Sequence, residues 1–278
     1  VIASEGLGFD VVSSGELYTT LTALEQMGIF EQSKNKIYFH GNNKSVTELK
    51  YALLTGCKII VDNWLELETL VKLGADLGID SIPILLRLTP GIECHTHEYI
   101  RTGHLDSKFG FDPNQIDAVL TYVLQNPILN CLGLHAHIGS QIFERQPHQD
   151  LGGVLIEWMQ KAIHQYNLAI SEINVGGGLG IRYTERDDPP SIEEWVKTVS
   201  ESIANACQTH HLPLPKLISE PGRSLIATAC VTAYTVGGRK EIPDLRTYIS
   251  IDGGMSDNPR PITYQSVYRT AIANRMTE

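Results

Sequence analysis

Three short polar segments of the chain combine residue types that could bind a phosphate-bearing aromatic cofactor. They are residues 135–140 (His-Ala-His-Ile-Gly-Ser), 174–180 (Asn-Val-Gly-Gly-Gly-Leu-Gly) and 219–224 (Ser-Glu-Pro-Gly-Arg-Ser). Each follows a short apolar or β-branched run that is typical of a buried parallel strand. Because the carboxyl ends of neighbouring parallel strands share one face, where such folds bind ligands, we expect the three segments to meet there.

The three consecutive glycines, Gly176 to Gly178, have two interpretations. Glycine lets the backbone approach a ligand closely and present its N–H groups to phosphate oxygens. A tight turn that needs a positive φ would require the same residues, and such turns are common in α/β folds. The glycines alone favour neither interpretation.

Glu220 and Arg223 bring opposite charges to the end of one predicted strand. A carboxylate held there can pair with the ring nitrogen of a cofactor and keep that nitrogen protonated. A guanidinium can bind a carboxylate or a phosphate through two hydrogen bonds. The structural alternative is an ion pair between the two side chains themselves.

Histidines offer two further possibilities. His135 and His137 are two residues apart on a strand, so their side chains face the same way. They could form a metal pair, one of them could stack on an aromatic ligand, or they could be core residues with satisfied hydrogen bonds. No third ligand for a metal is evident. A second cluster fits no structural zinc spacing, so we expect no metal there; it comprises Cys94, His95, His97 and His104.

Composition narrows the class of protein. The chain has 278 residues, of which 42% are hydrophobic and 19% charged, and its formal net charge is −10. Without a Lys/Arg cluster, that charge argues against a nucleic-acid surface. No apolar stretch approaches membrane-spanning length, and the first residues of the given sequence do not show the n-region and h-region pattern of a signal peptide. The five cysteines are widely spaced without a Cys-x-x-Cys pair, which favours reduced thiols and a cytoplasmic location.

Strand-like runs alternate with helix-like runs over most of the chain. Capping-box patterns at Ser13/Glu16 and Ser45/Glu48 mark helix starts, and a helix is expected over 154–166. The seven strands are expected to start near Asp10, Ile37, Lys58, Ile82, Cys131, Glu172 and Lys216. A closed barrel of this type needs eight strands, so we expect the first β/α unit of a (β/α)8 TIM-type barrel to lie upstream of Val1.

The pattern changes after Gly222. Residues 230–236 and 247–251 read as strands without a strong helix between them, which indicates a separate β-rich region. We therefore expect an N-terminally truncated barrel at 1–225 and the beginning of a truncated C-terminal β-domain at 226–278. Residues 89–111 lack periodicity and are too long for an ordinary connection, which favours a functional or disordered loop.

Taken together, these segments resemble the alanine-racemase-like, barrel-type pyridoxal-phosphate decarboxylases. The resemblance covers essentially the whole chain, and the loop 102–110 with the His-Ile-Gly-Ser-Gln run at 137–141 favours the diaminopimelate branch over ornithine-type enzymes. The matching segments are 9–13 with 15–17, 41–45, 87–91, 102–110, 135–141, 176–180, 220–223, 252–255 and 260–261.

The resemblance implies a role for each matching residue. His137 would stack on the pyridine ring, Glu220 would pair with the ring nitrogen, and Arg223 would help to hold the phosphate. The full set of cofactor-binding residues would be Asp10, Arg87, His137, Ser140, Gly177, Gly178, Glu220, Pro221, Gly222 and Arg223. The substrate-binding residues would be Arg223, Arg260 and Tyr264, which would bind the carboxylates of the substrate.

The implied reaction is the pyridoxal 5'-phosphate-dependent decarboxylation of meso-2,6-diaminoheptanedioate to L-lysine and CO2, by a homodimer. The Schiff-base lysine and the proton-donor cysteine of the family fall outside the expected fragment, so no catalytic residue is assigned within it. Lys44 matches a different family motif and is more often a surface or ion-pair residue. Alternatives are a related decarboxylase for arginine, ornithine or carboxynorspermidine, and a non-catalytic pyridoxal-phosphate-binding homologue.

Overall fold

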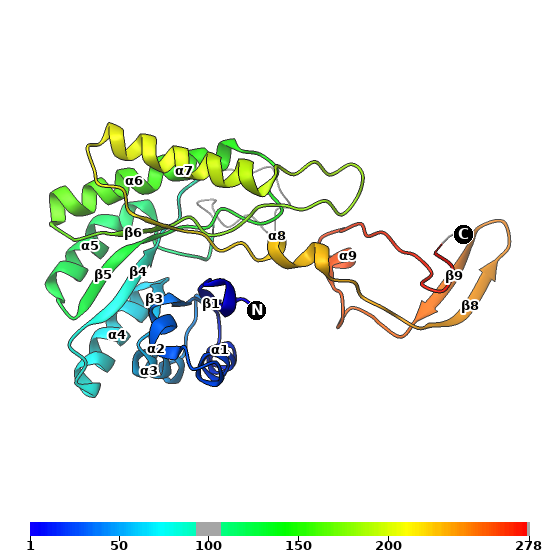
Figure 1. Ribbon diagram of the computed structural model, residues 1–278, viewed down its shortest axis with the longest axis horizontal. Coiled ribbons are helices and arrows are strands. Elements are labelled where there is room, and N and C mark those ends of the chain that lie inside the picture. Colours follow the sequence, from blue (N-terminus) through cyan, green and yellow to red (C-terminus); the bar gives the residue numbers. More distant parts are fainter. Residues whose placement is uncertain (93–106, 277–278) are drawn as a thin grey trace.

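The computed structural model describes residues 1–92 and 107–276, and its main feature is a sheet of seven parallel strands (Figure 1). The strands neighbour one another in chain order, as in a (β/α)8 barrel, which confirms the expected fold class. All seven begin within two residues of the expected positions. They are β1 (Phe9–Val11), β2 (Ile37–Phe39), β3 (Lys58–Val61), β4 (Ile82–Arg87), β5 (Leu129–His135), β6 (Glu172–Asn174) and β7 (Lys216–Ile218).

Helices cover the outer face of this sheet (Figure 1). They are α1 (Ser14–Gln26), α2 (Phe30–Ser33), α3 (Val46–Thr55), α4 (Trp64–Leu77), α5 (Ile116–Gln125), α6 (Gln146–Tyr166) and α7 (Ile192–Thr209). Short 3-10 helices lie at Ala3–Glu5, Lys34–Lys36, Pro113–Gln115 and Ala227–Ala229. The caps agree with the sequence: Ser13 accepts a hydrogen bond from the Glu16 N–H, and Ser45 with Glu48 forms a complete capping box.

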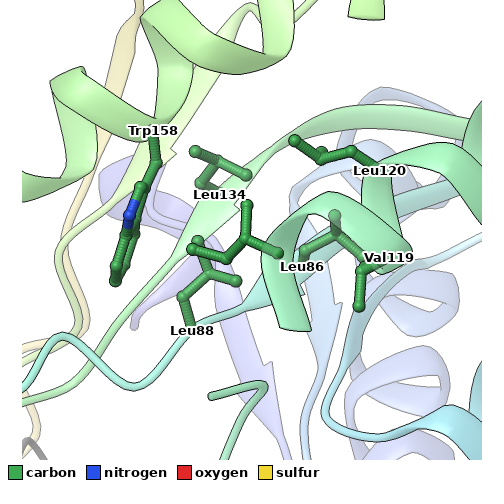
Figure 2. A pocket seen from close by; sticks show the side chains of 7 residues that line it. Leu86, Leu88, Val119, Leu120, Leu134 and Trp158 are labelled. Atoms are coloured by element: carbon green, nitrogen blue, oxygen red, sulfur yellow. The ribbon is translucent and has the colours of Figure 1, made fainter. Parts of the chain in front are cut away.

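The two faces of the sheet bury different side chains. In β2, Ile37 and Phe39 join the large core between sheet and helices, whereas Tyr38 faces the other side with Ile60 and Leu85. This alternation follows from the two-residue repeat of a strand. Figure 2 shows the outer layer between β4, β5 and α5, α6, where a small apolar gap is too narrow for a water molecule. That gap is a packing feature and offers no binding site.

Cross-sheet contacts show that the sheet is curled. The Lys58 ammonium on β3 lies 2.5 Å from the Glu172 carboxylate on β6, three strands away. The Tyr38 hydroxyl on β2 donates to the same carboxylate at 3.3 Å. Since Lys58 and Glu172 are the first residues of their strands, this polar cluster closes the amino-terminal end of the strands and leaves the carboxyl end for the polar segments.

Two elements differ from the sequence expectation. Helix α6 begins at Gln146 rather than 154, because Gly152 and Gly153 interrupt the helical pattern. A Cβ at Gly152 would lie 2.3 Å from the Ser202 Oγ, so this glycine allows α6 and α7 to approach closely.

The second difference is a wrong strand assignment beyond the barrel. The expected strand at 230–236 does not form, and β8 (Val236–Ile242) pairs instead with β9 (Arg246–Ile251) in an antiparallel hairpin. A turn with Asp244 in the left-handed region joins them. Two four-residue helices, α8 (Arg223–Ile226) and α9 (Arg260–Thr263), lie on either side of the hairpin in sequence. None of the helices described is long and apolar enough to cross a membrane.

Candidate active site

The three polar segments meet at the carboxyl end of β5, β6 and β7, as the sequence predicts. The Gly177 N–H donates to Nδ1 of His137 at 3.2 Å, and the Glu220 N–H donates to the Gly176 carbonyl at 2.9 Å. A Cβ at Gly177 would lie 2.4 Å from the Glu220 carbonyl oxygen. The glycine turn therefore fits between its two neighbours only because it has no side chain.

Glu220 is the charged centre of the site. Its Oε1 accepts a hydrogen bond from Asn174 Nδ2 at 2.7 Å and lies 2.8 Å from His40 Nε2. Its Oε2 lies 3.4 Å from His135 Nε2. Burial acts to raise the pKa of Glu220, but the neighbouring His40 and His135 outweigh burial and hold it well below its ordinary value. The site thus presents a fixed carboxylate, and its side chain is 13% exposed.

The neighbouring histidines His135 and His137 are neutral at physiological pH. Burial lowers the pKa of His135 to about 3 and that of His137 to about 4. A neutral His137 ring agrees with its role as acceptor from the Gly177 N–H. An uncharged imidazole can stack on an aromatic ligand without bringing a competing positive charge.

A second group of residues forms an anion-binding corner. One terminal nitrogen of Arg223 donates to Ser140 Oγ at 2.9 Å, and the other donates to the Tyr183 hydroxyl at 2.7 Å. Gly178 packs beside this corner, since a Cβ there would lie 2.8 Å from the Gly139 carbonyl oxygen. Pro221 and Gly222 form the turn that carries Arg223 into α8. The corner offers a guanidinium, a hydroxyl and closely approaching glycine backbone.

Asp10 is the middle residue of β1 and Arg87 the last residue of β4, and both interact electrostatically with Glu220. The Asp10 carboxylate lies 3.6 Å from His40 Nε2. Burial raises the pKa of Asp10 to about 6. Arg87 lies 3.4 Å from the Asp62 carboxylate and stacks over the Phe109 ring at 4.4 Å. These two residues surround the carboxylate centre without touching it directly.

A hollow of about 760 Å³ lies beside the anion-binding corner. All three expected substrate-binding residues line it, namely Arg223, Arg260 and Tyr264, together with Tyr183. The Tyr183 hydroxyl also accepts from the Arg260 guanidinium at 3.4 Å. Two positive charges therefore flank one side of the hollow, and this is a suitable arrangement for an anionic group.

Sequence reasoning missed three members of the site. His40 ends a strand-like run, Asn174 opens the glycine segment, and Tyr183 lies in the loop after it. A polar residue at the carboxyl end of a β-strand was the available signal for His40 and Asn174. Nothing in the local sequence distinguishes Tyr183, because its role depends on two arginines that are distant in the chain.

The predicted ion pair and the predicted metal sites have different outcomes. Within the described residues, Glu220 and Arg223 do not pair with each other, so the ion-pair alternative is wrong. His40 Nε2, His135 Nε2 and a Glu220 oxygen lie within 4.8 Å of one another and could hold a metal ion, but with His40 rather than His137 as the second histidine. The cluster Cys94, His95, His97 and His104 lies outside the described residues, as do residues 102–106 of the predicted loop motif.

Lys44 is an ion-pair residue, as the sequence alternative proposed. Its ammonium donates to the Glu66 carboxylate at 2.6 Å and to the carbonyls of Gly41 and Ile60, both at 2.8 Å. Both charged side chains are almost completely buried. These bonds fix the loop after β2 and do not present Lys44 to the site.

The donor set fits a pyridine ring that carries a phosphate. Glu220 can accept from a protonated ring nitrogen, His137 offers a flat neutral face, and Arg223 with Ser140 offers charge-assisted donors to phosphate. Nε of Arg223 is buried and has no hydrogen-bond partner among the residues that the structure describes. A buried donor of this kind is normally satisfied by a ligand or ordered water.

Comparisons with known proteins agree with this chemistry. The chain is 68% identical over its whole length to a diaminopimelate decarboxylase of Synechocystis, of which it covers 59%, and 44% identical over 99% of its length to that of Bacillus subtilis, of which it covers 61%. The chain thus spans about three fifths of these relatives.

Solved structures give the same result. A diaminopimelate decarboxylase of Helicobacter pylori complexed with L-lysine matches with a TM-score of 0.80 at 26% identity, over 96% of this chain and 63% of that one. The diaminopimelate decarboxylase of M. jannaschii in complex with L-lysine matches with a TM-score of 0.82 at 29% identity. That match covers 96% of this chain and 60% of the other. Residues 1–227 match the family model for the pyridoxal binding domain of pyridoxal-dependent decarboxylases, and the chain therefore belongs to that family.

Proposed function

We propose that the protein to which this chain belongs converts meso-2,6-diaminoheptanedioate to L-lysine and CO2. The observation that carries this proposal is the pair of guanidinium groups, Arg223 and Arg260, that line one hollow beside the Glu220 site. The 68% identity to a diaminopimelate decarboxylase supports the same substrate. The homologues crystallised with L-lysine support a site that accepts the product.

Pyridoxal 5'-phosphate, when bound, supplies a ring that accepts the electron pair released as CO2 leaves. We propose that Glu220 holds a proton on the ring nitrogen, and that its depressed pKa keeps it a carboxylate for this purpose. His137 supports the ring face, while Ser140, Gly177, Gly178 and the 221–223 turn hold the phosphate. Asp10 and Arg87 adjust the charge around Glu220.

Arg223, Arg260 and Tyr264 are proposed to bind the substrate carboxylates. A charge-assisted bond from arginine to a carboxylate contributes roughly 1.5–3 kcal/mol. A substrate without the distal carboxylate leaves a guanidinium without its partner and loses that contribution. The site therefore favours a diacid with an amino group at each end. We further propose that the complete enzyme is a cytoplasmic homodimer.

The test is steady-state decarboxylation by the full-length enzyme. We expect a preference for meso-2,6-diaminoheptanedioate over L-ornithine and L-arginine of at least about two orders of magnitude in kcat/KM. Arg260→Ala should erode that preference more than it weakens pyridoxal phosphate binding. Arg239→Ala, at an exposed position on β8, is the matched control. Equal or better activity on ornithine or arginine would overturn the substrate and leave the cofactor assignment intact.

A further inference from the structure

His40 lies beside Glu220 in the loop between β2 and α3. It follows β2 directly, and its N–H donates to the Val11 carbonyl at 2.8 Å, which fixes the backbone to β1. Its ring is 6% exposed and packs edge-on against the ring of His135, with centroids 5.0 Å apart. Backbone and ring are therefore both held in place, and Nε2 lies 2.8 Å from Oε1 of Glu220.

The two oxygens of Glu220 have different surroundings. Oε1 receives both close contacts, from Asn174 Nδ2 at 2.7 Å and from His40 Nε2 at 2.8 Å. Oε2 has a longer contact of 3.4 Å with His135 Nε2. Because burial keeps His135 neutral, it attracts the carboxylate less than a charged imidazole would. Oε2 is therefore the oxygen available to a further donor.

The electrostatic setting favours the protonated form of His40. Burial acts to lower the pKa of His40, but the charge and hydrogen bond of Glu220 outweigh it, so the pKa lies above its ordinary value. Asp10 adds to this effect, whereas Arg87 opposes it. The titratable and charged groups that interact with His40 are Asp10, Asp62, Arg87, His135, His137 and Glu220.

We propose that His40 is a positioning residue, which fixes Oε1 of Glu220 so that Oε2 remains free to pair with the ring nitrogen of the cofactor. The proposal rests on the proposed function, because it assigns His40 a role toward the same pyridine ring. Asp10, 3.6 Å from His40 on its other side, compensates the charge of the imidazolium.

Two substitutions separate the polar contact with Glu220 from simple packing. His40→Gln keeps an N–H donor near the position of Nε2, whereas His40→Leu removes it and leaves Glu220 with Asn174 as its close partner. Loss of the imidazole that lies 2.8 Å from a buried carboxylate corresponds to at least about a tenfold loss of pyridoxal phosphate affinity for His40→Leu. We expect His40→Gln to stay within about threefold of the wild type, on the same reasoning.

The experiment measures the dissociation constant of pyridoxal phosphate by absorbance, in the full-length protein stripped of cofactor. His164→Gln, at an exposed position on α6, is the matched control. A double-mutant cycle adds Glu220→Gln, in which the effect of His40→Leu should fall below about threefold because the two residues act together. Equal losses in His40→Leu and His40→Gln, or an undiminished effect in the Glu220→Gln background, would refute the positioning role.

A second readout needs no cofactor. The ring-nitrogen chemical shifts of His40 in the cofactor-free protein should report a pKa above the ordinary histidine value, and Glu220→Gln should lower it. A His40 pKa at or below the ordinary value would refute the contact with Glu220. Absence of pyridoxal phosphate binding by the wild type would instead refute the proposed function, and with it a role of His40 toward the ring.

Discussion

Glu66→Gln should be among the most destabilising single-atom changes in the barrel. The Glu66 carboxylate lies 2.6 Å from the Lys44 ammonium, and the two side chains are 4% and 2% exposed. Its second oxygen accepts the Asp62 N–H at 3.1 Å. A glutamine has one acceptor and one donor where the carboxylate has two acceptors, so it must direct its NH2 group at one of these two donors.

The magnitude follows from the burial of the pair. Removing one partner of a buried ion pair leaves an uncompensated charge and costs about 3–5 kcal/mol. Since each kcal/mol lowers the melting temperature of a domain of this size by about 2–4 °C, we expect a decrease of roughly 6–20 °C. Thermal unfolding followed by circular dichroism measures it. Glu201→Gln removes a carboxylate 3.9 Å from the exposed Lys197 and should change the free energy of unfolding by less than about 1 kcal/mol.

The paired replacement Lys44→Met with Glu66→Leu tests the reasoning further. Replacing both charges by apolar groups of similar volume removes the desolvation cost together with the attraction, and should recover much of the lost stability. If Glu66→Gln melts within about 2 °C of the wild type, the Lys44 ammonium does not need the Glu66 carboxylate to compensate its charge, and the expected cost of about 3–5 kcal/mol is refuted.

Three further predictions concern the site. Gly177→Ala places a Cβ 2.4 Å from the Glu220 carbonyl oxygen and should weaken pyridoxal phosphate binding at least about tenfold in an absorbance titration. The control is Gly153→Ala in α6, where open space surrounds the new Cβ; this substitution should slightly raise the melting temperature. Asp10 has a pKa of about 6 in the folded chain against 3.8 ordinarily, so its contribution to stability is present below pH 3.8 and lost as the pH rises through 6. Asp10→Asn should therefore melt above the wild type at about pH 7, with a difference that disappears toward about pH 4; a constant difference would contradict this. Glu220→Gln should lower kcat strongly, since the change removes the charge that pairs with the ring nitrogen and little shape; unchanged turnover would make Glu220 a purely structural residue.

Local signals in the sequence predicted the local structure well. Ser45 and Glu48 lie within one helical turn of each other, so their reciprocal hydrogen bonds were predictable from spacing alone. The strand ends that carry Glu220 and the glycines were predictable for a similar reason, because apolar runs and turn residues are contiguous in the chain.

Features that depend on contacts between distant residues were not predictable in this way. Strand β8 contains Gly237, Gly238 and three charged residues, which gives it a weak strand signal, and its pairing with β9 decides its conformation. His40 and Tyr183 have unremarkable sequence neighbours, and they become site residues only when curling of the sheet brings Glu220 and the arginines to them. The boundary at 225/226 between barrel and C-terminal β-domain remains a prediction.

The contact of Tyr183 with both Arg223 and Arg260 has an evolutionary consequence. The two arginines lie on either side of residue 227, where the match to the pyridoxal binding domain ends. Arg223 belongs to the segment that also carries Glu220, whereas Arg260 belongs to the following segment. Exchange of the later segment between relatives would alter one wall of the hollow and leave His40, Asn174 and Glu220 untouched. Under the proposed function, substrate choice can therefore diversify by recombination at this junction while the proposed cofactor-binding residues are inherited unchanged.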